Sequence, residues 1–275
     1  MRIKLHSPYN HFPNHFPNEG ELYINCYNDA YVTHNVEPNS IALLIEPRSI
    51  QPKVYAYMDE HWDKFKYVFT HDSELLKKPN AKLILWGGVY DWSDMEKDFE
   101  HPISMVASHK ELSPVRIQRK NLALEFKAKN NPKICTYGTF DGGQFADTKT
   151  IYGIHPFSVV IENHIDDYWF TEKICNCFAN YCVPIYYGAR RITDFFSADG
   201  IIQCNSIEEI KTVVNYILNH AREEYYLRIS AIQQNHFKVK KYENFETWFF
   251  GHYDELLDEL GVKNGLFYHD KGENK

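Results

Sequence analysis

The sequence lacks any uninterrupted apolar run that approaches the roughly 18 residues of a membrane-spanning helix. Its first ten residues, MRIKLHSPYN, also lack the apolar stretch that forms the centre of a signal peptide. These two absences lead us to expect a protein without a transmembrane segment that works in the cytoplasm, alone or as a soluble part of something larger.

Blocks of basic residues are missing as well, and acidic residues outnumber basic ones by 37 to 30. We therefore expect no nucleic-acid partner, because binding to phosphate backbones relies on basic patches. The six cysteines are scattered, which argues against a framework of disulfides. Cys175 and Cys177 lie two residues apart in a helical pattern and face different directions, which argues against a shared metal ion.

What the sequence does contain is a series of short apolar runs that end in polar residues or glycine and alternate with helical patterns. This alternation is typical of parallel strands covered by helices, so the expected fold class is α/β. The expected strands span residues 2–6, 40–46, 66–72, 82–88, 103–108, 133–138, 156–163, 183–188 and 201–204.

A polar and acidic stretch, DWSDMEKDFEHP at residues 91–102, divides these strands into two groups. We therefore predict an N-terminal domain over residues 1–98 and a C-terminal domain over residues 99–275, each with an open α/β sheet. The chain from residue 221 to 262 is predicted to be mostly helical, and its last helices can pack back on the N-terminal domain. In open α/β sheets ligands bind at the carboxyl ends of the strands, so a functional site is expected there.

One such strand end lies in the stretch FSVVIENHIDDYWFTEKI, residues 157–174. Glu162 and Asn163 follow its apolar strand, and a carboxylate at that place can bind the hydroxyls of a sugar or ribose. Glu172 and Lys173 open the next predicted helix. The N–H groups and the dipole of a helix N-terminus favour a phosphate, and Lys173 would add a positive charge.

Arg116 lies near the start of another predicted helix, at residues 114–129, and its guanidinium is suited to clamp a diphosphate with two parallel hydrogen bonds. Glu172 is suited to accept a hydrogen bond from a ribose hydroxyl. A second interpretation stays open at this point. In it, Glu172 only caps its helix, and Lys173 and Arg116 are ordinary surface charges.

Four segments between residues 103 and 205 resemble the donor-binding region of glycosyltransferase family 10, the α1,3/4-fucosyltransferases. In chain order they are MVASHKELSPVRIQRK, VVIEN, FTEKICNCFANY and CVPIYYG. The resemblance implies two facing Rossmann-like domains, the GT-B arrangement, with a cleft between them. It also implies an inverting transfer of fucose from GDP-fucose to a glycan hydroxyl, with a nucleotide sugar and a carbohydrate acceptor as partners. No cofactor or metal is required in principle, because cationic side chains can stabilise the leaving diphosphate.

The resemblance also assigns roles to residues of the donor site. Arg116 and Lys173 would hold the pyrophosphate, Glu172 would bind the ribose, and Glu162 and Asn163 would approach the fucose and its phosphates. Where the family has a tyrosine near the Thr-Glu-Lys motif, this sequence offers Tyr168 and Trp169 for stacking. An inverting transfer needs a general base, and Glu46 in IALLIEPRS occupies the strand-end position at which the family has a glutamate.

The sequence departs from the family pattern in several places. His109 stands where the family has an asparagine, at a position of contacts to the donor. The N-terminal domain, which in the family usually helps to select the acceptor, is short, so the acceptor cannot be carried over. The membrane anchor and luminal disulfides of the family are missing, which fits a cytoplasmic protein of bacterial or viral type. Two alternatives remain, a transferase that uses another nucleotide sugar and a non-catalytic protein that binds nucleotide or carbohydrate.

Overall fold

The computed structural model describes residues 1–9, 15–262 and 265–269. It divides into two compact units, one made of Met1–Leu85 with Asn244–Lys275 and the other of Trp86–Glu243. The sequence places the boundary after residue 98, whereas in the structure residues 86–98 group with the second unit. The chain from Asn244 onward groups with the first unit.

Among its described residues, the first unit forms a parallel sheet of six strands in the order β11-β1-β2-β3-β4-β5. The strands are β1 (Arg2–His6), β2 (Tyr23–Asn28), β3 (Ile41–Leu43), β4 (Tyr67–Thr70), β5 (Ala81–Leu83) and β11 (Phe267–His269). The last strand returns to the edge beside β1, where Ile3 pairs with Phe267. Strands β1 to β5 therefore follow chain order across the sheet.

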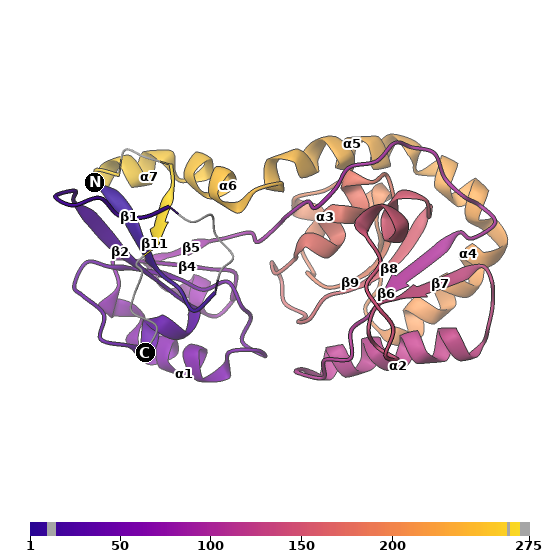
Figure 1. Cartoon of the computed structure of the whole chain (residues 1–275), viewed down its shortest axis with the longest axis horizontal. Helices are drawn as coiled ribbons and strands as arrows, with labels where there is room; N and C mark the ends of the chain where they lie inside the picture. Colours follow the sequence, from indigo (N-terminus) through magenta and orange to yellow (C-terminus); the bar gives the residue numbers. More distant parts are fainter. Residues whose placement is uncertain (10–14, 263–264, 270–275) are drawn as a thin grey trace. The chain divides into compact units, whose positions relative to one another are not determined.

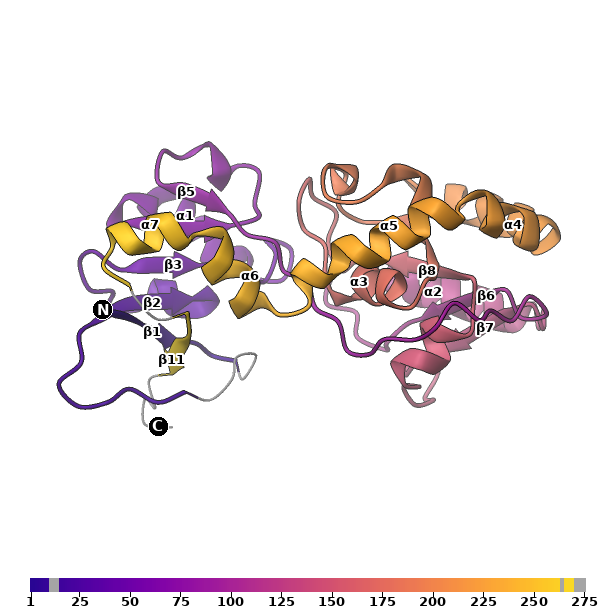
Figure 2. The same cartoon turned by 90° about the horizontal axis from the view of Figure 1, so that it is seen from above.

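Helices cover both faces of this sheet. Helix α1 (Pro52–His61) packs its buried Tyr55 and Met58 into the core on one face. Helices α6 (Phe245–His252) and α7 (Asp254–Glu259) lie on the opposite face (Figures 1 and 2). There the rings of Phe69 and Phe249 meet edge to face with centroids 4.8 Å apart.

The second unit contains a parallel sheet of five strands in the order β10-β9-β8-β6-β7. They are β6 (Ile103–Val106), β7 (Ile134–Tyr137), β8 (Phe157–Ile161), β9 (Val183–Tyr187) and β10 (Ile202–Gln203). The chain runs outward from β6 to β7 and then crosses to the other side of β6 to form β8. Strands β6 and β8 therefore flank the point where the strand order reverses, and ligands bind at such points in open α/β sheets.

Four principal helices cover the faces of the second sheet. Helices α2 (Pro114–Ala128) and α4 (Ile207–Leu227) contribute Leu122, Phe126 and Ile210, among others, to the core. Helices α3 (Glu172–Ala179) and α5 (Ile229–Val239) pack against each other. Figure 1 shows α2 on one side of the sheet and α3 with α5 on the other. A π-helical turn at Lys149–Gly153 precedes β8.

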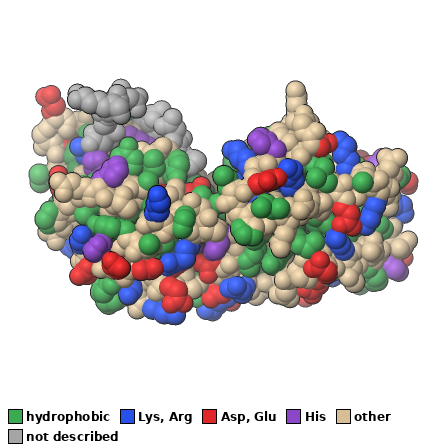
Figure 3. Space-filling view, turned by 90° about the horizontal axis from the view of Figure 1, so that it is seen from below, with side chains coloured by type: hydrophobic (Ala, Val, Ile, Leu, Met, Phe, Trp, Pro, Cys, Tyr) green, Lys and Arg blue, Asp and Glu red, His purple; other side chains and the backbone are tan. Residues whose placement is uncertain are grey.

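Both sheets are parallel and alternate with helices, as the sequence pattern predicts for the α/β class. In the part of the chain that the structure describes, no helix combines the length and apolarity needed to cross a bilayer. Acidic and basic side chains are interspersed on the face that Figure 3 shows. All six cysteines are free thiols, and all but Cys135 are buried.

Candidate functional site

A cavity of about 540 Å³ lies in the second unit, at the carboxyl ends of its strands. This volume is within the range of pockets that hold small ligands. The segments that follow β6, β7 and β8 contribute to its wall, together with the first turns of α2 and α3. Its lining residues are Tyr90, Val106–Lys110, Arg116, Arg119, Thr139, Phe145, Ala146, Thr148, Ile151, Tyr152, Asn163, Glu172, Lys173 and Asn176.

The first turn of α2 brings Arg116 to the cavity. Ser113 is the N-cap of this helix, and its hydroxyl accepts a hydrogen bond from the Arg116 N–H at 3.3 Å. Pro114 occupies the first turn, where its missing N–H removes no helical hydrogen bond. The Ser113 hydroxyl also donates to the carbonyl oxygen of Asn163 at 2.9 Å, which fixes the start of α2 against the segment after β8.

Arg119 lies one turn further along α2, on the same face as Arg116. Its side chain is almost fully buried and donates to the Ile161 carbonyl oxygen at 2.6 Å and to Asn163 Oδ1 at 2.9 Å. Burial lowers the pKa of the guanidinium, and the nearby negative charge of Glu162 offsets part of this effect. Arg119 therefore adds a positive charge to the cavity and also fixes the end of β8.

A buried carboxylate supports the first turn of α3. Glu162 is fully buried directly after β8, and its two oxygens accept hydrogen bonds from the Thr171 N–H at 3.0 Å and the Thr171 hydroxyl at 2.8 Å. Burial raises the pKa of Glu162, although the charge of Lys173 opposes this effect. Thr171 is the N-cap of α3. Glu162 therefore connects the end of β8 to the start of α3.

Lys173 and Glu172 form the part of α3 that lines the cavity. Lys173 Nζ donates to Glu172 Oε1 and to Thr171 Oγ1, both at 2.9 Å, and lies 3.6 Å from Glu162 Oε2. Burial alone would raise the pKa of Glu172, but the charge and hydrogen bond of Lys173 bring it below its usual range. Glu172 is therefore a carboxylate, able to accept hydrogen bonds from hydroxyl groups.

The charges of the cavity favour an anion. Four cationic side chains line it, Lys110, Arg116, Arg119 and Lys173, against the single carboxylate of Glu172. The N-termini of two helices, α2 and α3, add the positive ends of their dipoles.

Apolar side chains form another part of the wall, and they suit a planar base. Ile151 and Tyr152 are buried, whereas Phe145 is 62% exposed. Nearby, His109 Nδ1 and the Thr139 hydroxyl are hydrogen-bonded at 2.9 Å.

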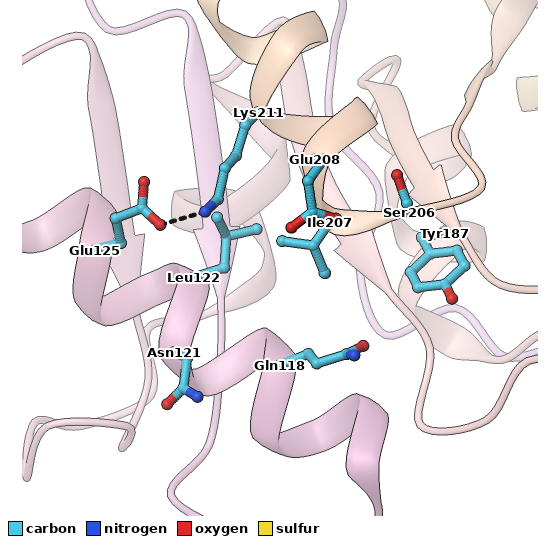
Figure 4. A pocket seen from close by; sticks show the side chains of 9 residues that line it. All are labelled: Gln118, Asn121, Leu122, Glu125, Tyr187, Ser206, Ile207, Glu208 and Lys211. Atoms are coloured by element: carbon cyan, nitrogen blue, oxygen red, sulfur yellow. Dashed lines mark ion pairs between the residues drawn. The ribbon is translucent and has the colours of Figure 1, made fainter.

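A smaller cavity of about 240 Å³ in the same unit has the opposite balance of charge, with more carboxylates than cations in its lining (Figure 4). It lies between α2 and the start of α4, and its cation, Lys211, forms an ion pair with Glu125 at 2.6 Å. Glu208 adds a second carboxylate, so this cavity does not favour a phosphate. Within the described residues, no group of three His, Cys, Asp or Glu side chains is arranged to hold a metal ion.

Four of the residues that we predict from the sequence for the donor site lie together in the structure. Arg116, Asn163, Glu172 and Lys173 all line the large cavity. Glu162 lies beneath them on the Thr171 cap and is not part of the lining.

The two aromatic candidates also lie outside this lining. The Tyr168 hydroxyl accepts a hydrogen bond from Arg191 at 2.6 Å. Trp169 is buried, and its ring meets that of His164 with centroids 6.2 Å apart.

Glu46 belongs to the first unit, three residues after the end of β3. It is partly exposed, and its N–H and carbonyl groups are both hydrogen-bonded, to Asp29 at 3.2 Å and to the Tyr55 hydroxyl at 2.9 Å. Sequence reasoning missed Arg119, although its spacing of three from Arg116 on one helix offered a signal. It also missed Tyr90 and Phe145, which lie outside the matched motifs and carry no such signal.

A sequence model described as "Glycosyltransferase family 10 (fucosyltransferase) C-term" matches residues 100–254, more than half of the chain. The match includes every residue proposed for the donor site, and Glu46 lies outside it. No curated protein sequence matches the chain.

Several solved structures have a similar fold. A structure titled "Crystal Structure of alpha1,3-Fucosyltransferase with GDP-fucose" aligns with a TM-score of 0.53 and 14% identity, over 92% of this chain and 82% of that one. An α1,3-fucosyltransferase structure with GDP gives 0.51 and 14%, over 79% and 71%. TarM gives 0.55 and 11%, over 84% of this chain and 54% of its own. These similarities confirm the α/β class with two parallel sheets.

Proposed function

The chain belongs to glycosyltransferase family 10, and from this premise we propose that it transfers fucose from GDP-fucose to a glycan hydroxyl, with inversion at the anomeric carbon. The observation that carries the proposal is the cavity at the β6/β8 reversal, where four cations face one carboxylate. One structure with a similar fold was determined with GDP-fucose, which is consistent with this donor.

The pyrophosphate is the part of the donor for which the cavity is best suited. Arg116 and Lys173 each lie in the first turn of a helix, where the N–H groups and the helix dipole favour a phosphate. As the bond to fucose breaks, negative charge grows on the leaving GDP, and these two cations stabilise it there. This stabilisation lowers the barrier without a requirement for a metal ion.

The remaining contacts follow from the donors and acceptors that line the wall. Glu172, held as a carboxylate beside Lys173, accepts a hydrogen bond from a ribose hydroxyl. The amide of Asn163 approaches the fucose and its phosphates, with its side-chain oxygen oriented by Arg119. Glu162 acts beneath the site, because it holds the Thr171 cap and the charge of Lys173 in place.

Inverting transfer also requires a group that takes the proton of the attacking hydroxyl, and Glu46 is the candidate for this general base. It follows β3 in the first unit, and within the described residues its carboxylate makes no hydrogen bond or ion pair. A carboxylate without such a partner is able to accept a proton from a bound hydroxyl.

A nucleotide panel in metal-free buffer tests the donor assignment. A ligand that binds only the folded state raises the melting temperature, so GDP is expected to stabilise the protein more than UDP, ADP or CMP does. Stabilisation by UDP instead would favour a transferase with another nucleotide sugar. No shift with any of the four nucleotides would contradict the assignment of the cavity.

A further inference from the structure

The segment that carries Glu46 leaves the first sheet just before this residue. Strand β3 ends at Leu43, and the Leu44 N–H still donates to the Phe69 carbonyl oxygen of β4 at 2.8 Å. The next two N–H groups, of Ile45 and Glu46, lie beyond this pairing. Ile45 is buried, and a buried N–H group needs a hydrogen-bond acceptor, because without one it destabilises the fold.

Asp29 accepts both of these N–H groups. Its Oδ1 lies 2.8 Å from the Ile45 nitrogen and 3.2 Å from the Glu46 nitrogen. Its Oδ2 accepts a hydrogen bond from Asn28 Nδ2 at 2.9 Å. A carboxylate can accept on both oxygens at once, whereas an asparagine at this position would place its NH₂ group against that of Asn28.

The carbonyl group of Glu46 is held from the opposite side. The buried Tyr55 of α1 donates its hydroxyl hydrogen to this oxygen at 2.9 Å. Asp29 and Tyr55 therefore fix the N–H and the C=O of a single residue, and together they set the direction of its Cα–Cβ bond. The Glu46 side chain itself remains partly exposed.

Both the burial of Asp29 and its backbone conformation are energetically unfavourable for an aspartate. The residue is fully buried, and burial raises the pKa of its carboxyl to about 7. Its backbone φ is 46°, in the left-handed region, which non-glycine residues seldom adopt although aspartate tolerates it better than most. Buried carboxylates and unusual backbone conformations persist at functional sites, where their neighbours determine them.

We propose that Asp29 is a positioning residue for the general base, which it acts on by fixing the backbone of Glu46 from the N–H side. This inference depends on the proposed function, because it takes Glu46 as the base. Asp29 itself touches neither donor nor acceptor in this account. Its loss leaves the cavity of the second unit intact and allows the Glu46 carboxylate to move from the productive geometry.

The test measures the hydrolysis of GDP-fucose, in which water takes the fucosyl group in place of the acceptor hydroxyl and GDP is released, and it measures the affinity for GDP in the same variants. In Asp29→Gly, which keeps the positive φ accessible, the turnover rate is expected to fall about 10- to 100-fold, because small displacements of a reacting group have effects of this size. Asp29→Asn is expected to lose less, since its oxygen can still accept both N–H groups. The KM for GDP-fucose and the affinity for GDP stay within about twofold of wild type, since the donor cavity is unchanged.

Glu246→Gln is the matched control. Glu246 is another buried carboxylate of the first unit, and it accepts a backbone hydrogen bond from Phe267 at 2.9 Å. It is expected to keep the wild-type turnover rate. A turnover loss in Glu246→Gln equal to that in Asp29→Asn at equal stability would reduce Asp29 to a structural residue and overturn the inference.

Glu46→Gln separates the two proposals. If this variant loses turnover while folded Asp29→Gly and Asp29→Asn keep it, only the positioning role of Asp29 fails. If Glu46→Gln itself keeps full turnover, the assignment of the base fails, and the role of Asp29 fails with it. Tyr55→Phe removes the hydrogen bond to the Glu46 carbonyl oxygen and is expected to lower turnover, as the Asp29 variants do.

Discussion

The first unit carries strands β1 to β5 in chain order across its sheet, whereas the second unit reverses direction between β6 and β8. The reversal is accompanied by a cavity lined by four cations and one carboxylate, and this balance of charge favours an anionic ligand. The first unit instead presents one carboxylate, Glu46, on a segment whose backbone is held by buried side chains. We infer that the second unit is suited to bind the donor and the first to supply an oriented base.

In both units a buried carboxylate at the end of a strand holds the backbone of a neighbouring segment. Glu162 lies directly after β8, and Asp29 lies directly after β2. Each is fully buried, accepts a backbone N–H hydrogen bond from a segment that carries proposed site residues, and has its pKa raised by burial. A buried carboxylate at the end of a strand is thus a way to orient a neighbouring segment without entering the site itself.

The largest expected effect is that of Glu46→Gln. Loss of a general base slows a reaction by about 10²- to 10⁴-fold, so GDP release from GDP-fucose is expected to fall by that factor. The affinity for GDP, measured by calorimetry on the same sample, should not change. A parallel loss of affinity and turnover would show that Glu46 does not act on the chemistry alone and would break the division between the units.

The pH dependence of stability gives the next largest effect. Because the pKa of Asp29 in the folded protein is raised to about 7 from 3.8, the folded state binds the proton more tightly than the unfolded state does. The contribution of this group to the free energy of unfolding is highest below about pH 4 and falls by up to about 4 kcal/mol as pH rises to 7. Asparagine does not titrate, so wild type should lose stability relative to Asp29→Asn over this range.

Urea unfolding of the two proteins across that pH range measures the difference. A difference in unfolding free energy that stays constant with pH would mean that Asp29 titrates normally in the folded protein.

Two arginines on one face of α2 are expected to behave differently. Arg116→Ala removes a charge from the donor cavity and should weaken GDP binding about 10- to 100-fold with little change in stability. Arg119→Ala should weaken binding and also destabilise the protein by about 2–4 kcal/mol, because it leaves the Ile161 and Asn163 oxygens without their donor. Calorimetry with GDP and urea unfolding measure the two effects. Equal stability losses would argue against the separate roles.

The smallest expected effect concerns the apolar part of the cavity. Phe145 is 62% exposed, and a stacked guanine base would cover part of its ring. Phe145→Ala is expected to weaken GDP binding by about 1 kcal/mol, roughly fivefold, while leaving the binding of inorganic pyrophosphate unchanged. Equal weakening for both ligands would show that the guanine base of GDP does not stack on Phe145.

Much of the second unit could be predicted from the sequence, because its buried strands are continuous apolar runs and its helices start with recognisable caps. The strand 156–163 and the helices predicted to begin near Pro114 and Glu172 are examples. The sequence also predicts four of the residues that line the cavity. It does not reveal that Glu162 lies outside the lining of the cavity, because the burial of this carboxylate depends on Thr171, nine residues later.

The first unit was harder to predict. Strand β2, YINCYN, mixes polar and apolar residues, and β11 has three residues, so neither forms a continuous apolar run. Strand β11 pairs with β1 across more than 260 residues of sequence, which no local pattern can indicate. The role of Asp29 is hidden for the same reason, since its partners lie 16 and 17 residues away.

A pair of lysine variants tests the central claim most directly, which is that the second unit binds the diphosphate at the β6/β8 reversal. Lys173 and Lys211 both belong to the second unit, and each is paired with a glutamate, but only Lys173 lines the large cavity. In metal-free calorimetric titrations with GDP, Lys173→Ala is expected to weaken binding by at least about tenfold, while Lys211→Ala keeps the wild-type affinity. Equal affinities in the two variants would contradict the account.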